Sequence, residues 1–191
     1  MVIAKGEIMS NIDFIHEKVD TIIKKFDTRD PFEICKCMDV HIHYKDLGNA
    51  LKAYYFCQSR IKNIVINSRS GIIVRRILCA HELGHAVLHS KLAAIRGFQE
   101  MALFDSLIST EYEANLFTAE LIISDEEILE MLNSRDKCFF SIAKELYVPV
   151  ELLDFKLRIL KHKGLRIEIP YIAQSNFLRN DVPEYGLINI Q

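Results

Sequence analysis

The pattern H-E-L-G-H at residues 81–85, inside the largely apolar run 72–89, constrains this chain more than any other stretch. On a helix, residues four apart lie about 40° apart around the axis and one turn along it, so the His81 and His85 imidazoles point to one side. Two imidazoles that converge from consecutive turns provide half of a tetrahedral zinc site. Glu82 lies about 60° from His85 on the same wheel, where a general base can take a proton from a water molecule on the metal.

The side chains around this pattern predict that its helix is buried. They leave little polar face, because the flanking positions include Ile73, Val74, Ile77, Leu78, Ala80, Val87 and Leu88. A helix that is apolar nearly all round belongs to a protein core, so its two histidines and its glutamate would be buried polar groups that need partners. A metal ion supplies such partners, whereas a chance match would more often fall on a solvated helix.

A second long helix, predicted over residues 109–123, offers acidic residues that could complete a zinc site. With Glu111 as zero on the helical wheel, Asn115 falls near 40° on the buried side. Glu113 and Glu120 fall on the opposite side, which we expect to face solvent. Glu111 is therefore the predicted third ligand, and Asn115 suits a residue that orients a ligand side chain. Glu113 remains the alternative ligand, although its position also fits a capping box.

Three further histidines need an interpretation. His89 follows His85 by four residues, but residues 86–88 lack the glycine that breaks the helix in longer zinc motifs. On an unbroken helix His89 lies too far along the axis to share the ion, so capping of the helix end or packing is predicted. His41 and His43 point outward from a predicted strand, and without a third ligand nearby they are predicted to be solvated surface residues.

Length, charge and cysteine content limit the class of protein to which this chain can belong. With 191 residues, 50% of them hydrophobic, the chain can bury a core, predicted over residues 10–135, with a helical C-terminal extension over 136–191 packed on it. A net charge of −2 gives the chain no excess of basic residues that would indicate nucleic-acid binding. No apolar run is long enough for a membrane span, and the start has no signal-peptide pattern. An odd set of five cysteines favours free thiols and a cytoplasmic location.

The hydrophobic period predicts an α+β fold with a small antiparallel sheet. A helical period over residues 10–26 gives way to alternation over 40–45, which is typical of a strand. Residues 51–57 and 61–67 are rich in aromatic and β-branched side chains and predict a hairpin. The predicted sheet therefore precedes the H-E-L-G-H helix.

Two C-terminal helices, predicted over residues 139–146 and 150–160, have the outline of a helix-turn-helix. A DNA reader needs basic residues along its second helix. That helix offers Lys156 and Arg158 but sets acidic residues among them, so a packing hairpin is predicted and nucleic acid is not an expected partner.

The order of these segments resembles the ImmA/IrrE family of zinc metallopeptidases. The resemblance covers roughly residues 12–132, and its specific motifs are H-E-L-G-H and E-Y-E-A-N-L-F-T-A-E-L at residues 111–121. Ser124 stands where the family usually has a proline, a departure that we expect to affect the helix end only. The resemblance implies a thermolysin-like, gluzincin core, in which the sheet and the glutamate helix pack on the H-E-x-x-H helix.

The resemblance also implies a function. It places the metal ligands on His81, His85 and the acid of the second helix, and the general base on Glu82. It implies a cytoplasmic zinc endopeptidase of narrow specificity, whose substrate is a helix-turn-helix repressor of a mobile genetic element or a stress operon. A donor for the oxyanion is left open among Tyr54, Tyr55, Tyr112 and His89.

A non-catalytic regulator is the alternative function. Such a protein would be stabilised by its metal and would bind a repressor or DNA, so that it would keep the ligands and make Glu82 dispensable. The intact H-E-x-x-H pattern favours the enzyme, because a structural zinc site is usually closed by a fourth protein ligand and no fourth ligand is evident in the sequence.

Overall fold

The computed structural model describes residues 5–49, 51–90, 103–133 and 138–167, together with 173, 174, 176 and 178. Its elements, in chain order, are α1 (Lys5–Phe26), α2 (Pro31–Cys37), β1 (Val40–Lys45), β2 (Ala53–Gln58), β3 (Ile61–Asn67), α3 (Ile72–Leu88), α5 (Leu103–Ile122), α6 (Asp125–Asn133), α7 (Phe139–Glu145) and α8 (Val150–His162). The predicted α+β class is confirmed.

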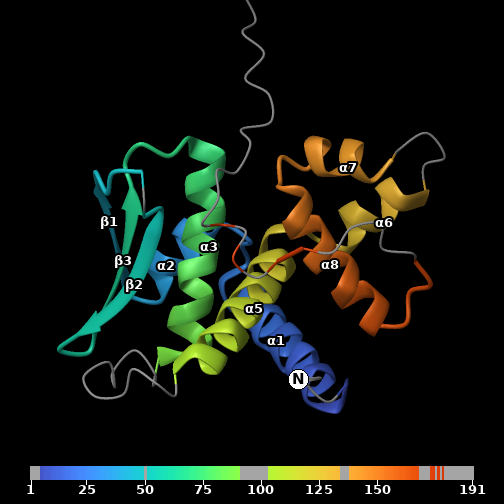
Figure 1. Ribbon diagram of the computed structural model, residues 1–191, viewed down its shortest axis with the longest axis horizontal. Helices are drawn as coiled ribbons and strands as arrows, with labels where there is room; N and C mark the ends of the chain where they lie inside the picture. Colours follow the sequence, from blue (N-terminus) through green and yellow to red (C-terminus); the bar gives the residue numbers. More distant parts are fainter. Residues whose placement is uncertain are drawn as a thin grey trace, which may run out of the picture.

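The elements form successive layers. Figure 1 shows the sheet at one side of the molecule, α3 next to it, α5 crossing beside α3, and α6, α7 and α8 at the opposite side. One hydrophobic core runs through these layers, and it includes Ile64 of β3, Leu83 of α3, Phe117 of α5 and Phe155 of α8. The H-E-L-G-H helix is therefore an inner layer, as its apolar circumference predicts.

The sheet is mixed rather than wholly antiparallel. Its strand order is β1-β3-β2, with β2 antiparallel and β1 parallel to β3. The antiparallel prediction is correct only for the β2–β3 hairpin, whose tight turn has positive φ at Ser59 (51°) and Arg60 (68°). β3 is the most buried strand and takes the centre, which leaves β1 and β2 as the two edges.

The contact between α3 and α5 depends on a glycine. A Cβ atom added to Gly84 would lie 3.2 Å from the Phe117 ring and 3.3 Å from the Ala114 Cα. Such distances are tighter than ordinary van der Waals contact, so a larger residue at this position would require Ala114 or Phe117 to shift by a few tenths of an ångström. The close approach sets the H-E-L-G-H turns of α3 against the turns of α5 that contain Ala114 and Phe117.

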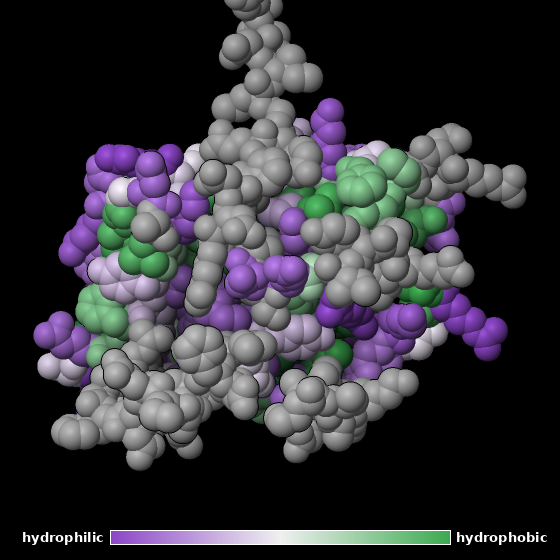
Figure 2. Space-filling model, in the orientation of Figure 1, coloured by the Kyte–Doolittle hydropathy of each residue, from purple (hydrophilic) through white to green (hydrophobic). Residues whose placement is uncertain are grey.

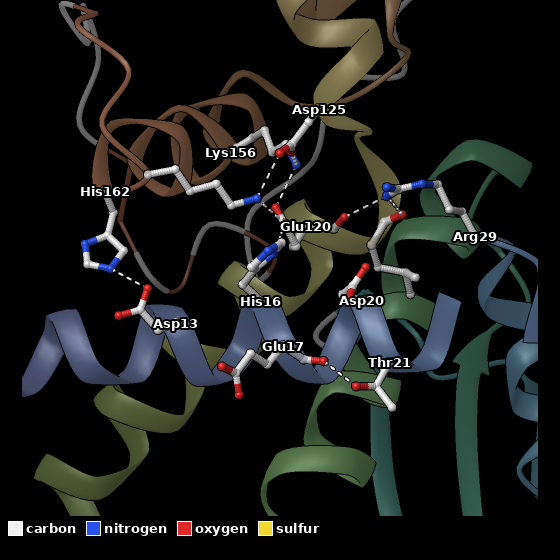
Figure 3. A network of polar contacts seen from close by, with 12 residues as sticks. Asp13, His16, Glu17, Asp20, Thr21, Arg29, Glu120, Asp125, Lys156 and His162 are labelled. Atoms are coloured by element: carbon white, nitrogen blue, oxygen red, sulfur yellow. Dashed lines mark hydrogen bonds and ion pairs between the residues drawn. The ribbon is translucent and has the colours of Figure 1, made fainter. Parts of the chain in front are cut away.

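A buried ionic network joins α8 to the rest of the protein (Figure 3). Lys156, which is 0% exposed, lies 2.6 Å from Glu120 of α5 and 2.5 Å from Asp125 of α6. Lys163 contacts the same two carboxylates at 2.8 and 2.9 Å. His16 of α1 lies 2.6 Å from Glu120, which thus receives contacts from two other helices.

Glu120 is consequently not on a solvent-facing side of its helix. The wheel prediction was wrong at this position, because α1 and α8 pack over that side and leave Glu120 only 5% exposed. Burial raises the pKa of Asp125, but hydrogen bonds from Lys156 and Lys163 outweigh that effect and bring the pKa to about 2. The same two lysines lower the pKa of Glu120 against the effect of its burial. Both carboxylates of the network are therefore ionised at neutral pH.

The surface in Figure 2 is mixed, with hydrophilic side chains over the sheet and a hydrophobic patch over α7, where Phe140 is 61% exposed. Among the helices that the structure describes, none combines the length and the apolar character that crossing a membrane requires.

Candidate metal centre

Two packed helices bring three potential metal ligands together. His81 and His85 lie on consecutive turns of α3, with their Nε2 atoms 3.1 Å apart. The Glu111 carboxylate of α5 spans both rings, with Oε2 3.4 Å from His81 Nε2 and Oε1 3.5 Å from His85 Nε2. These residues form the one group of three or more metal-ligating side chains found among the described residues.

The separations within this group suit a small tetrahedral cation. Zinc bonds imidazole nitrogen and carboxylate oxygen at about 2.0–2.2 Å, which places neighbouring ligand atoms of a tetrahedron roughly 3.3 Å apart. The two Nε2 atoms, 3.1 Å apart, lie close to that value, and each of them lies 3.4–3.5 Å from a different oxygen of Glu111, while one ligand atom from each residue lies within 4.8 Å of the others. The donor set of two imidazoles and a carboxylate is one that zinc uses in catalytic sites.

The electrostatics of the group also favour a cation. His81 and Glu82 are buried, at 5% and 7% exposure. Burial lowers the pKa of His81, but hydrogen bonding to Glu111 and the charges of Glu82 and Glu111 outweigh it, and the pKa lies above its ordinary value. Two carboxylates beside two imidazoles thus leave a negative site that a divalent ion would neutralise.

Asn115 lies one turn after Glu111 on α5 and is fully buried. A polar interaction between its carboxamide and His81 contributes to the raised pKa of that imidazole. This is the position that the helical wheel predicts for a residue that orients a ligand, since Asn115 follows Glu111 on the buried side of the helix.

Glu113 does not join the three-residue group, and the wheel prediction that it faces solvent was wrong, because its side chain is only 22% exposed and lies against the end of α3 and against α1. Its Oε2 atom lies 2.8 Å from His89 Nε2, and His89 Nδ1 lies 3.2 Å from His85 Nδ1. His89 is also the residue at which α3 ends, as its helix-end prediction requires. The link from Glu113 through His89 to His85 was missed in the sequence, although the spacing of four between the two histidines was a signal for it.

The two histidines of β1 lie outside the metal-ligating group. His43 contacts Asn63 at 3.0 Å on β3, and His41 lies 3.6 Å from the exposed Asp39. Neither histidine belongs to a metal-ligating group among the residues described here.

Two of the four candidate donors to an oxyanion have other contacts. Both ring nitrogens of His89 are engaged, and Tyr112 packs its ring against Phe155 of α8.

An H-E-x-x-H helix packed against a helix that contributes a glutamate has the ligand arrangement of a metallopeptidase. Comparison with known families agrees, since residues 35–158 match the IrrE N-terminal-like domain, a peptidase family. The chain belongs to this family, as its motifs predict. The matched region contains α3, α5 and all three members of the metal-ligating group.

Two curated relatives carry informative names. The chain is 34% identical over 142 residues to a protein of Bacillus phage phi105 named uncharacterized immunity region protein 2, a match that covers 74% of this chain and 88% of the relative. It is 30% identical over 149 residues to metallopeptidase ImmA of Bacillus subtilis strain 168, and this match covers 75% of this chain and 83% of the relative. Family membership therefore supports a metal-dependent peptidase that acts on a protein.

Proposed function

We propose that this chain is a zinc-dependent endopeptidase of narrow specificity that cleaves a helix-turn-helix repressor of a mobile genetic element or a stress operon. The observation that carries the proposal is the group of His81, His85 and Glu111, in which one ligand atom of each residue lies within 4.8 Å of the other two, beside the buried Glu82. In this proposal the two Nε2 atoms and the Glu111 carboxylate hold the ion. The described residues offer no fourth protein ligand in this group, which leaves a position for water.

Glu82 is the proposed general base. A bound zinc ion would polarise a water molecule and lower its pKa towards about 7. Glu82 accepts the proton of that water as it attacks the scissile carbonyl, and then gives the proton to the leaving amine. Burial of Glu82 keeps its carboxylate away from bulk water, where hydration would weaken it as a base.

The edge of β2 is the proposed place for the substrate backbone. β2 is an edge strand of the sheet and lies against α3, which carries the H-E-L-G-H pattern. An extended peptide can add to such an edge through main-chain hydrogen bonds, while side chains set its specificity. The name of the phage relative refers to an immunity region, and this favours a substrate among the proteins of a mobile element.

The competing function, a regulator that reads DNA through α7 and α8, is disfavoured by the contacts of α8. Lys156 is buried against Glu120, and Arg158 pairs with the buried Asp154 at 2.7 Å. These are basic residues that a recognition helix would direct at phosphates. We expect the protein to act in the cytoplasm, where a repressor would be its substrate.

Glu82→Gln separates catalysis from metal binding. The amide cannot accept the proton of the attacking water, so we expect cleavage to slow by about 10²–10⁴-fold while one zinc per chain is retained. The assay incubates purified protein with zinc and a panel of helix-turn-helix repressors from mobile elements, followed by mass spectrometry of the fragments and zinc analysis of the enzyme.

Two results would contradict this proposal. Cleavage by the Glu82→Gln variant at the wild-type rate would remove Glu82 from the mechanism. Folded wild-type protein that binds no zinc, even after zinc is added, would remove the enzyme function altogether and leave a binding protein.

A further inference from the structure

We propose that His89 and Glu113 are positioning residues, which fix the tautomer and the ring orientation of His85 for metal binding. This inference rests on the proposed metal site and adds to it a chain of contacts that runs away from the ligand atoms. His85 Nε2 faces His81 and Glu111, whereas His85 Nδ1 lies 3.2 Å from His89 Nδ1. His89 Nε2 in turn lies 2.8 Å from Glu113 Oε2.

A single arrangement of protons satisfies all of these contacts when His85 binds a metal. A metal ligand presents the lone pair of Nε2, so the proton of a neutral His85 ring must be on Nδ1. That N–H donates to His89 Nδ1, which must then accept, and the proton of His89 is consequently on Nε2. His89 Nε2–H donates to the Glu113 carboxylate, which only accepts. Each hydrogen bond in this chain therefore fixes the direction of the next one.

Glu113, the last residue in this series of hydrogen bonds, is itself held in place. Glu113 Oε1 accepts from the Asn11 side chain of α1 at 3.0 Å and from the Ser109 hydroxyl at 3.3 Å. With Oε2 on His89, both oxygens of Glu113 have defined donors. A carboxylate fixed from two helices can orient His89, and a hydrogen-bonded partner of this kind both orients a ligating imidazole and raises its basicity.

His85 and His81 are supported differently. His81 is buried beside Asn115 of α5, whereas His85 is oriented from the C-terminal end of its own helix. Removal of His89 or Glu113 should therefore affect only the His85 arm of the site. Glu113 contacts His89, and His89 contacts His85, so we expect the influence of Glu113 on His85 to pass through His89.

A double-mutant cycle on zinc affinity tests this inference. The zinc Kd is measured by chelator competition for the wild type, His89→Ala, Glu113→Ala and the double variant. We expect His89→Ala to raise the Kd by about 10–100-fold. Glu113→Ala should raise the Kd by several-fold when His89 is present and by less than about twofold when His89 is absent, because it acts through that residue.

The controls separate positioning from folding. The melting temperature of each metal-free variant should stay close to that of the wild type, and His41→Ala, which removes an exposed histidine of β1, should leave the Kd unchanged. If His89→Ala does not fold, Glu113→Gln and Glu113→Ala carry the test. The amide can still accept from His89 but lacks the charge, so the Kd should rise in the order wild type, Glu113→Gln, Glu113→Ala.

The outcomes are distinguishable from failure of the proposed function. Wild-type protein that binds no zinc would overturn both proposals together. Wild-type protein that binds zinc, with the same Kd in the His89 and Glu113 variants, would overturn only this one. Equal effects of Glu113→Ala in both backgrounds would also overturn it, since independent effects mean that Glu113 does not act through His89.

Discussion

Glu111 and Glu113 lie two residues apart on α5 and have separate partners. Two helical residues turn the Cα–Cβ direction by about 200°, yet both carboxylates reach the histidines at the C-terminal half of α3. Glu111 meets the paired imidazoles of His81 and His85, while Glu113 meets His89 at the end of α3. Two glutamates of similar exposure thus have distinct proposed roles, one as a ligand and one as a support.

Glu111→Ala tests this division at the scale of a residue. Two imidazoles alone hold zinc much more weakly than a three-ligand site, so we expect the purified variant to contain less than about 0.1 zinc per chain after dialysis. Glu113→Ala, the matched change two residues away, should retain zinc under the same conditions with a weaker Kd. Zinc emission spectroscopy against protein concentration measures both, and equal zinc content in the two variants would refute the assignment.

The packing of α3 on α5 is the structural requirement at the scale of the elements. The three ligand atoms come from both helices, so their separations depend on how closely the helices approach. Gly84 lies between His81 and His85 in the sequence, and its missing side chain faces Ala114 and Phe117 of α5. The H-E-L-G-H motif therefore contains two of the three proposed ligands and also the glycine that lets the helix of the third ligand pack closely.

Gly84→Ala should destabilise the protein, although alanine is the better helix former. The gain in helix propensity is about 1 kcal/mol, while overpacking a full interior costs about 1–3 kcal/mol. The added Cβ would meet backbone atoms of Ala114, which cannot turn aside as a flexible side chain can. We expect a net loss in the free energy of unfolding of up to about 2 kcal/mol by urea denaturation.

Two further results bear on the Gly84 argument. Gly84→Ser, which is larger by one oxygen, should lose more stability than Gly84→Ala, and both variants should bind zinc more weakly than the wild type. A Gly84→Ala protein as stable as the wild type would show that α3 and α5 have room to spare at this contact.

At the scale of the whole molecule, the ionic network ties four helices together. Glu120 of α5 and Asp125 of α6 bind Lys156 and Lys163, which lie on and just after α8, and His16 of α1 joins at Glu120 (Figure 3). The division into residues 10–135 and 136–191 stays a prediction. The network crosses the boundary between these two ranges, because Glu120 and Asp125 belong to the first range and Lys156 and Lys163 belong to the second.

Lys156→Ala and Lys163→Ala form a matched pair, because the two lysines contact the same carboxylates but differ in how far they are buried. The Lys156 side chain is 0% exposed and that of Lys163 is 24% exposed. Removal of the buried lysine leaves two carboxylates short of a counter-charge, and we expect a loss of about 3 kcal/mol or more in the free energy of unfolding. Loss of the more exposed Lys163 should cost about 1 kcal/mol or less.

Urea denaturation at neutral pH measures this pair of variants. A single unfolding transition, shifted to lower urea in Lys156→Ala, would show that the C-terminal helices unfold together with the core. Equal losses for the two variants would mean that burial does not govern the strength of this network.

The sequence by itself predicted whatever depends on local spacing. The helix over residues 72–88, its burial, and the convergence of His81 and His85 follow from the helical period and from the apolar residues around it. The helical wheel of α5 predicted that Glu111 and Asn115 lie on its buried side, and the resemblance to the family implied that this helix packs on the histidine helix. These features involve residues within a few turns of one another, where backbone geometry leaves few alternatives.

Only the tertiary structure decided the features that join distant segments. The parallel pairing of β1 with β3, the burial of Glu120 beneath α1 and α8, and the link from Glu113 through His89 to His85 all depend on which elements become neighbours. A helical wheel gives the direction of a side chain but not what covers it. Burial, hydrogen-bond partners and ligand separations are properties of packed pairs of elements, and these are set by the hydrophobic core as a whole.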